Sequence, residues 1–394
     1  VGFLMDGILL LEKQKETNHY QIQSLPINSG VFCLKKDRFQ DVVWIGTDGQ
    51  GVYLYSNPLY SIKSMVLSNY TEKIERPVRA IYLDDERTFW VGTKGNGILK
   101  IYDYEFDKNI SDCRAEVLTT SNSALSSNAV YCFAKSHRNL LWIGDEEGLT
   151  YYSYREKRIK SIPIRIGNED FKYIHDIYET ADSELWLVSV GMGVVKARIA
   201  GTPDNPVIVD AQRYIINDGE LGSNYFFTIY AENEANLLFG NKGYGVFRYN
   251  ETTNGLEPVS THKYENMTLN NILAISKDSS NNYLFGTSYG LIKYTSETSY
   301  QLFNAKNGFL NNTIHAILRN SSDDFWLSTN LGLINFDTKR NVFRSYGFGD
   351  GLKVVEFSDG AGFRDSRTGT LFFGGINGVV AIRADGRPEQ LYMP

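Results

Sequence analysis

The sequence predicts an all-β fold, a β-propeller of four-stranded blades, and three observations lead to this prediction. The 394 residues include 26 Tyr, 22 Phe and 35 Gly but only 9 Pro, a composition that favours strands and tight turns. A segment that contains a Trp or another apolar residue, a small residue and a glycine turn recurs eight times. A second apolar segment precedes each copy at a nearly constant distance.

The repeat is clearest in VWIGTDGQGVYLY at 43–55, where Trp44 serves as the anchor residue. The anchors of the eight copies are residues 44, 90, 142, 186, 238, 284, 326 and 372. They are about 47 residues apart on average, within the period of propeller blades.

Each repeat is expected to supply four strands, A to D. Strand A is an apolar-x-x-apolar run that lies 12 or 13 residues before seven of the anchors. In the last copy this run, at 354–357, lies 18 residues before the anchor, and we expect a longer A–B turn there. Strand B carries the anchor in a continuous apolar run, as in a strand buried on both faces. Strand C follows a glycine turn, and strand D is more variable.

Two glycine positions recur. The one in strand B, Gly46 in the first copy, is expected where backbones approach closely. The one before strand C, Gly51 in the first copy, is expected to supply the positive φ of a hairpin turn. Its equivalents are Gly97, Gly148, Gly193, Gly245, Gly290, Gly332 and Gly378. The third residue of strand A is mostly small, which suggests crowding around an axis.

The ends of the chain predict the domain organisation. Segments 7–13 and 20–25 look like strands C and D of a partial blade at 1–27, and 28–387 would form a propeller of eight repeats. These repeats fit seven or eight blades in one ring, closed by strands from both termini. They leave open that residues 1 to about 76 belong partly to a preceding propeller.

Composition excludes several functions. A net charge of −6 and a pI near 5.5 argue against nucleic acid as a partner. No apolar window is long enough to cross a bilayer. The three cysteines exclude a disulfide framework and a CxxC metal site. The five histidines have no zinc-ligand spacing, paired carboxylates fall in turns, and the GxG strings lack a following helix. We therefore expect no catalytic residue, no metal site and no cofactor.

The motifs LSSNAV (125–130), LGSNYF (221–226) and FLNNTI (309–314), followed by a strand B tryptophan in most copies, resemble the two-component-regulator propeller repeat. This repeat forms the periplasmic sensor of hybrid two-component systems in Bacteroidota, and the resemblance covers essentially the whole chain. It implies an inner-membrane-anchored, homodimeric parent protein with a second propeller and an immunoglobulin-like domain, to which 388–394 would be the linker. It further implies kinase and DNA-binding modules, oligosaccharide ligands and control of polysaccharide-utilisation genes.

Candidate ligand residues follow from position, because the B–C and D–A loops of a propeller share one face. Sugar recognition favours aromatic rings beside planar polar groups. The loop candidates are Tyr244, Tyr289, Asn241, Lys242, Lys94, Asp48, Asn330 and Asn377. His175 and His315 occupy one strand A slot in two copies, where they either line a central channel or pack between blades. For each loop residue, an ordinary role in the hairpin turn is the stronger explanation.

Three functions are compatible with this pattern. The first is a non-enzymatic sensor that binds an oligosaccharide. The second is a propeller polysaccharide lyase or glycosidase, which needs a converged acid/base pair or a metal cluster. The third is a protein-interaction scaffold. The resemblance favours the sensor, since fold alone does not give function.

Overall fold

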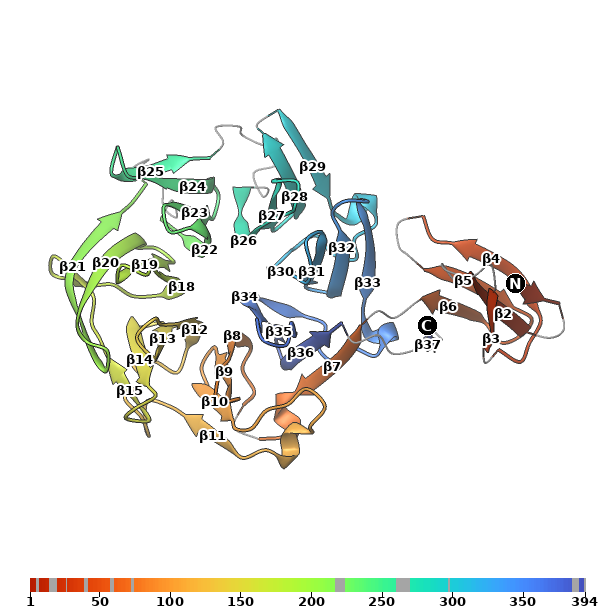
Figure 1. Ribbon diagram of the computed structural model, residues 1–394, viewed down its shortest axis with the longest axis horizontal. Coiled ribbons are helices and arrows are strands. Elements are labelled where there is room, and N and C mark those ends of the chain that lie inside the picture. The colour runs from red at the N-terminus through yellow and green to blue at the C-terminus, as the bar shows by residue number, and fades with distance from the viewer. Residues whose placement is uncertain are drawn as a thin grey trace.

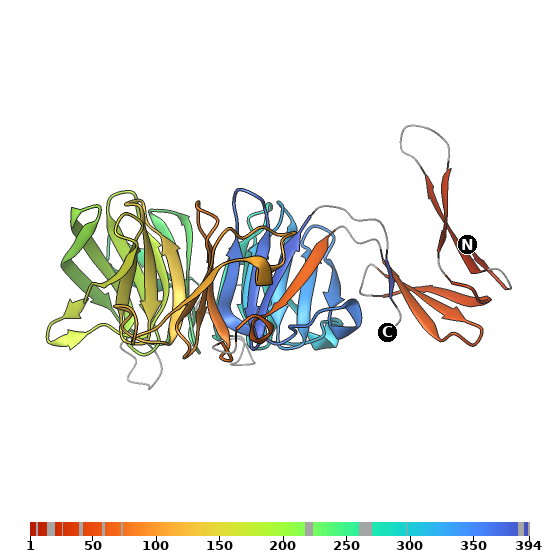
Figure 2. The same ribbon diagram turned by 90° about the horizontal axis from the view of Figure 1, so that it is seen from below.

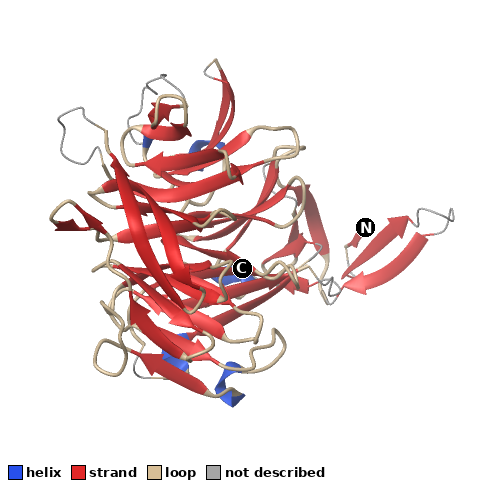
Figure 3. Ribbon diagram, turned by 60° about the vertical axis from the view of Figure 1, so that its left-hand side comes forward, coloured by secondary structure: helices blue, strands red, loops and turns tan. Residues whose placement is uncertain are grey.

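The computed structural model describes residues 1–4, 7–13, 20–25, 27–38, 42–56, 60–71, 74–216, 224–259, 270–296, 298–384 and 390–392. Within these residues the fold is all-β, and seven four-stranded antiparallel sheets surround a common axis (Figure 1). The helical elements are single 3₁₀ turns (Figure 3). They include η1 (Leu67–Asn69), η2 (Ile110–Asp112), η4 (Ala305–Asn307) and η5 (Phe348–Asp350). No helix in the described part of the chain is long and apolar enough to cross a membrane.

The strands of each blade run outward from the axis in the order A, B, C, D. Strands A are β8 (Val78–Leu83), β12 (Val130–Lys135), β18 (Ile174–Glu179), β22 (Phe226–Asn233), β26 (Ile272–Lys277), β30 (Ala316–Arg319) and β34 (Phe357–Arg364). Strands B are β9 (Phe89–Thr93), β13 (Leu140–Asp145), β19 (Glu184–Ser189), β23 (Asn236–Asn241), β27 (Tyr283–Thr287), β31 (Asp324–Thr329) and β35 (Leu371–Gly375). Strands C are β10 (Ile98–Ile101), β14 (Leu149–Ser153), β20 (Gly193–Thr202), β24 (Gly245–Asn250), β28 (Gly290–Ser296), β32 (Gly332–Asp337) and β36 (Gly378–Arg383). Strands D are β11 (Ala115–Leu118), β15 (Arg158–Ser161), β21 (Asn205–Tyr214), β25 (Gly255–Pro258), β29 (Ser299–Phe303), β33 (Val342–Tyr346) and β7 (Ser61–Val66).

One blade combines distant segments of the chain, and we call it the closing blade. Its strands A to C are β34, β35 and β36, whereas its outer strand is β7, which pairs antiparallel with β36. Its inner strand β34 contacts both β30 and β8, the inner strands of the two neighbouring blades. The ring therefore has seven blades, which decides between the two numbers that the sequence allowed.

The first sequence repeat lies outside this ring. Its strands β4 (Val31–Lys36), β5 (Val43–Thr47) and β6 (Val52–Ser56) form a separate sheet with β37 (Gln390–Tyr392). A further sheet contains β1 (Gly2–Phe3), β2 (Gly7–Lys13) and β3 (Tyr20–Leu25), the last two matching the strands expected near the N-terminus. Both sheets lie beside the ring (Figures 1 and 2).

This arrangement differs from the expected propeller at 28–387 of eight repeats. The ring comprises 61–383, because β7 follows the first repeat in sequence but serves as strand D of the closing blade. The expected linker at 388–394 contains β37, which pairs with β6, and residues 388, 389, 393 and 394 lie outside the described residues. A small hairpin of β16 (Arg165–Ile166) and β17 (Glu169–Asp170) completes the strands.

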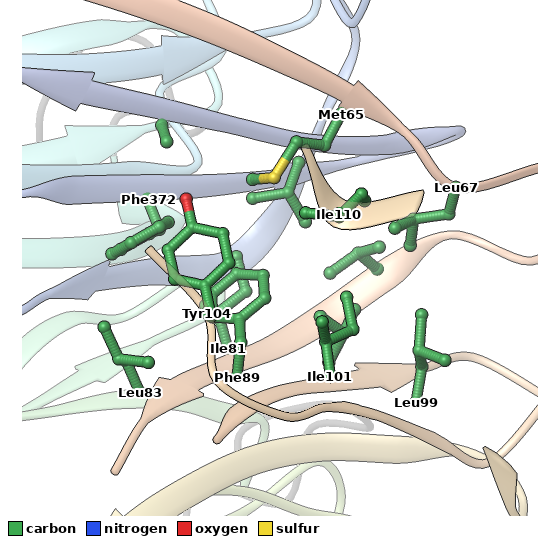
Figure 4. Close-up of a cluster of buried hydrophobic side chains, with 14 of the residues drawn as sticks. Met65, Leu67, Ile81, Leu83, Phe89, Leu99, Ile101, Tyr104, Ile110 and Phe372 are labelled. Carbon is green, nitrogen blue, oxygen red and sulfur yellow. The ribbon is translucent and has the colours of Figure 1, made fainter. Parts of the chain in front are cut away.

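The strand B anchors are among the most deeply buried residues of the ring. Trp90, Trp142, Trp186 and Trp326 are each no more than 2% exposed. Indole N–H groups need acceptors in such places, and Trp90 donates to Asp84 Oδ2 at 2.8 Å. Figure 4 shows a comparable cluster where the closing blade meets the next blade, with Phe89, Tyr104 and Phe372 packed together. Burial on both faces explains the continuous apolar runs of strands B.

The glycine in strand B and the small residue in strand A pair with each other, and there is no room for a larger side chain at the glycine. Gly92 pairs with Ala80, and a Cβ on Gly92 would lie 2.7 Å from Val130 Cγ1 in the next blade and 2.9 Å from Ala80 Cβ. A close approach does occur at this glycine, but it is made by side chains of two strands A and not by the predicted backbone. The glycine before strand C has a positive φ in seven repeats. For Gly378 that expectation is wrong: its φ is not positive, and a Cβ there would lie 2.1 Å from Met65 O.

The last strand A also differs from the expectation of 354–357. Strand β34 begins at Phe357, and its register shifts between Phe357 and Gly362, so most of the extra residues form a bulge in the strand. Ala361 takes the small position against Gly374, whereas Glu356 lies before the strand and is exposed. Bulges redirect side chains, and this one borders the candidate site.

Candidate ligand site at the mouth of the central channel

The second residue of strand A has a special position in the blades. In β8, for example, the register shifts between Val78 and Ala80, so that Arg79 is left out of the ladder. The same shift occurs in β12, β18, β22 and β26. These residues line a central cavity of about 180 Å³. The bulge of β34 adds Asp359, which contacts two of them. We call the resulting set the mouth ring: Arg79, Tyr131, His175, Phe227, Leu273, His315 and Asp359.

The mouth ring has a polar side. Asp359 Oδ1 lies 2.5 Å from His315 Nδ1, and Asp359 Oδ2 lies 3.6 Å from Arg79 Nη1. The other ring nitrogen of His315, Nε2, lies 2.7 Å from Asn330 Oδ1 in the B–C turn of the same blade. Four groups with planar polar ends therefore converge beside the cavity, and two of them, Arg79 and His315, line its wall.

The opposite side of the mouth ring is aromatic. The rings of Tyr131 and His175 stack with centroids 4.4 Å apart, and His175 meets Phe227 edge-on at 5.5 Å. The Arg79 guanidinium lies 5.9 Å from the Tyr131 ring centroid and joins the two sides. Deeper along the strands, the cavity wall is apolar, with Ile81 and Phe133 among its residues.

Asp359 carries a negative charge in the mouth ring. Burial acts to raise the pKa of Asp359, but the hydrogen bond from His315 and the charge of Arg79 outweigh it, and the pKa is lowered. Asp359 is therefore ionised and only accepts hydrogen bonds, so that His315 Nδ1 carries the proton between them.

His175 differs from His315. Burial, together with the charges of Arg79 and Lys94, lowers the pKa of His175 to about 3, and its imidazole is neutral. Among the described residues its ring nitrogens have no hydrogen-bond partner, and the buried Nε of Arg79 also lacks one. Both side chains can therefore bond to a ligand that enters the cavity.

Two further ionisable groups of the cavity wall have structural roles. The carboxylate of Asp176 accepts the backbone N–H groups of Ile177 at 2.9 Å and Ile229 at 2.8 Å, and burial raises its pKa to about 6. Burial likewise raises the pKa of the Cys132 thiol, which keeps it protonated. Within the described ranges, no three or more His, Cys, Asp or Glu side chains are grouped so that they could hold a metal ion.

Three of the ten residues singled out from the sequence meet at this mouth, and a fourth, Lys94, acts on it through its charge. His175 and His315 belong to the mouth ring, and Asn330 bonds to His315. Lys94 lies close enough for its charge to lower the pKa of His175.

The other six lie elsewhere or turn inward. Asp48 is in the β5–β6 turn of the separate sheet, and Asn241 is 0% exposed at the end of β23. Tyr244 and Tyr289 pack half-buried against apolar clusters between blades. Lys242 and Asn377 lie in B–C turns. Lys242 Nζ is 5.9 Å from the Tyr225 ring centroid, and Asn377 Nδ2 donates to Lys353 O at 3.5 Å.

Sequence reasoning missed Arg79, Tyr131, Phe227 and Asp359. The first three occupy the same strand A slot as the two histidines, so an alignment of that slot over all copies would have found them. Asp359 has no such signal, because the β34 bulge displaces it from the repeat register.

Comparison with known proteins gives the fold a context. No protein-family model matches the chain. An alignment with translation initiation factor 6 of Saccharolobus solfataricus is 31% identical over 140 residues but covers 32% of this chain and 57% of that protein, too little to assign a family.

Solved structures match far more of the chain. The extracellular domain of a putative hybrid two component system from B. thetaiotaomicron has a TM-score of 0.66 at 24% identity, covering 98% of this chain and 50% of that one. The extracellular domain of a putative one component system from B. thetaiotaomicron has a TM-score of 0.65 at 18% identity, covering 93% of this chain and 47% of that one. Virginiamycin B lyase from Staphylococcus aureus has a TM-score of 0.60 at 14% identity, covering 82% of this chain and 99% of that one.

The chain spans about half the length of the two B. thetaiotaomicron domains. At these identities the likeness establishes the fold. The chain is thus an all-β propeller that is similar in structure to the extracellular domains of B. thetaiotaomicron two-component systems, as its sequence motifs predicted.

Proposed function

We propose that this chain is the ligand-binding propeller of an extracytoplasmic sensor and that its channel mouth binds the end of an oligosaccharide. The observation behind this proposal is the division of the mouth ring into an aromatic side and a polar side. A sugar presents C–H groups that pack on rings and hydroxyls that bond to planar polar groups. Tyr131, His175 and Phe227 supply the first surface, and Arg79 and Asp359 the second.

The size of the cavity supports recognition of a chain end. At about 180 Å³ it is smaller than the pockets that enclose drug-sized ligands, which hold roughly 300–1,000 Å³. One sugar residue would enter, and the remainder of the oligosaccharide would lie across the loop face.

The geometry favours binding over catalysis. Both ring nitrogens of His315 are already hydrogen-bonded, so neither is free to take a proton from a substrate. His175 is free, but with a pKa of about 3 it is a weak base at neutral pH. The Asp359–His315 pair thus orients groups for a ligand, in contrast to the lyase and glycosidase alternatives.

The likeness to extracellular sensor domains supports the wider setting of this proposal. The parent protein would be anchored in the inner membrane and face the periplasm, with a second propeller and an immunoglobulin-like domain. Oligosaccharide binding would favour one arrangement of a homodimer and thereby control transcription of polysaccharide-utilisation genes.

A thermal-shift and calorimetry panel of plant and host oligosaccharides tests the proposal. A ligand at about 100 times its Kd should add roughly 2.7 kcal/mol of stability, and the sugar should be recovered uncleaved. With neutral oligosaccharides, Asp359→Asn should weaken binding about tenfold or more, whereas the matched change Asp48→Asn in the separate sheet should leave it unchanged. Cleaved sugar, or equal effects of the two variants, would contradict the proposal.

A further inference from the structure

Arg79 is buried to an unusual degree for an arginine with so few partners. Its side chain is 14% exposed, and its Nε has no hydrogen-bond partner among the described residues. Its guanidinium contacts Asp359 at 3.6 Å, longer than a hydrogen bond, and the face of Tyr131 at 5.9 Å. A buried cation normally needs closer compensation than this.

Asp359 cannot supply that compensation fully, because it is engaged elsewhere. Its Oδ1 is 2.5 Å from His315 Nδ1, about 1 Å closer than its Oδ2 is to Arg79. The His315 ring is itself fixed by Asn330, so Asp359 is held toward His315 and away from the guanidinium.

Two cations, Arg79 and Lys94, act on this side of the mouth. Lys94 lies in the B–C turn of the same blade, and it acts with Arg79 to keep the neighbouring His175 neutral. The opposing charges are Asp359, which is held toward His315, and Glu146 in the next blade, which with burial raises the pKa of Tyr131. Glu146 also accepts a hydrogen bond from Ser127 at 3.4 Å. Neither carboxylate lies within hydrogen-bond distance of the Arg79 guanidinium, so the guanidinium keeps donors for a ligand.

We propose that Arg79 binds an oxyanion on the terminal sugar, so that the channel mouth selects acidic over neutral oligosaccharides. This inference rests on the proposed function and adds the chemical class of the ligand. A hexuronate carboxylate or a sulfate ester would take two hydrogen bonds from the planar guanidinium, an arrangement that arginine favours. The unpaired nitrogens of His175 would bond a neighbouring hydroxyl, and the ring of Tyr131 or Phe227 would cover its C–H face.

Matched sugar pairs test the inference in titration calorimetry with this chain. Trigalacturonate is compared with its neutral methyl ester, and N-acetylglucosamine 6-sulfate with N-acetylglucosamine, which separates a carboxylate source from a sulfate source. We expect one acidic member to bind about 10- to 100-fold more tightly than its neutral partner, as for one charge-assisted pair. Arg79→Gln should abolish that preference, and Arg79→Lys should restore part of it.

Inorganic sulfate provides a probe that does not depend on sugar recognition. At constant ionic strength, exchange of chloride for sulfate should raise the melting temperature of the native chain more than that of Arg79→Gln. The matched control Arg198→Gln removes an exposed arginine of β20 and should behave as the native chain does. It also reports the general stabilisation by sulfate.

The outcomes separate the two proposals. Equal binding of acidic and neutral sugars would overturn the inference and leave the proposed function standing. A sulfate response that needs Arg79, without binding of any sugar, would support the anion site and count against oligosaccharide sensing. Loss of both responses in the native chain would overturn both proposals, and circular dichroism of each variant verifies that it is folded.

Discussion

Replacement of Gly92 by alanine tests whether the ring depends on the contact between neighbouring blades. The new methyl group would lie 2.7 Å from Val130 Cγ1 and 2.9 Å from Ala80 Cβ, distances that force one strand A to move. Overpacking of this kind destabilises the folded state by about 1–3 kcal/mol. The smaller conformational freedom of alanine in the unfolded chain offsets about 0.4–1 kcal/mol of this. We expect Gly92→Ala to destabilise the ring by about 1–2 kcal/mol, which lowers its melting temperature by about 1–3 °C.

The assay is denaturant and thermal unfolding of matched variants. Gly255→Ala is the control, because the atoms nearest to its new methyl group are 3.8 Å away. It should be neutral or slightly stabilising. The double variant Gly92→Ala with Val130→Ala should be more stable than the sum of its single effects predicts, since the clashing methyl is gone. Native stability in Gly92→Ala, or strictly additive effects, would refute the packing argument.

Three further predictions concern other parts of the ring. In the native state the pKa of His175 is lowered to about 3, so its neutral form contributes stability above its unfolded pKa of about 6.5 that is lost as the pH falls. Between pH 7.5 and 5.5, the free energy of unfolding of the native chain should therefore fall by about 1 kcal/mol more than that of His175→Gln. Parallel plots of the free energy of unfolding against pH for the two proteins would contradict this. A thiol reagent should modify exposed Cys33 rapidly and buried Cys132 only on unfolding; rapid labelling of both would show that the ring opens. Tyr60→Phe removes the hydroxyl that donates to Asp324 at 2.5 Å and should cost about 1 kcal/mol in denaturant unfolding, whereas no change would mean that the contact is not stabilising.

The sequence predicts the blades well because their strands are defined locally. Strands A to C recur with apolar runs and turn glycines, and both signals arise within one repeat. The partner of a strand D depends on tertiary contacts, because nothing in the sequence at 61–66 indicates that β7 pairs with β36. The number of blades and the separate position of the first repeat therefore could not be read from periodicity.

The candidate site was predictable only where the repeat register was intact. His175 and His315 were found because they share one slot of strand A. Tyr244 and Tyr289 were chosen as aromatic residues in turns, but an aromatic ring near a turn can equally bury itself between blades, and both are half-buried there. Asp359 depends on a bulge, and bulges follow from packing that a linear pattern does not contain.

The closing blade also bears on how the molecule is made. Its strands β7 and β36 are separated by roughly 300 residues of sequence. During synthesis β7 leaves the ribosome early, and its partner appears only after the other six blades have been translated. Until then the partly assembled arc has an unpaired β7 and open sheet edges, which are templates for intermolecular pairing. Escape from aggregation therefore depends on how quickly the last blade docks, and a chaperone that shields β7 should raise the yield of folded protein.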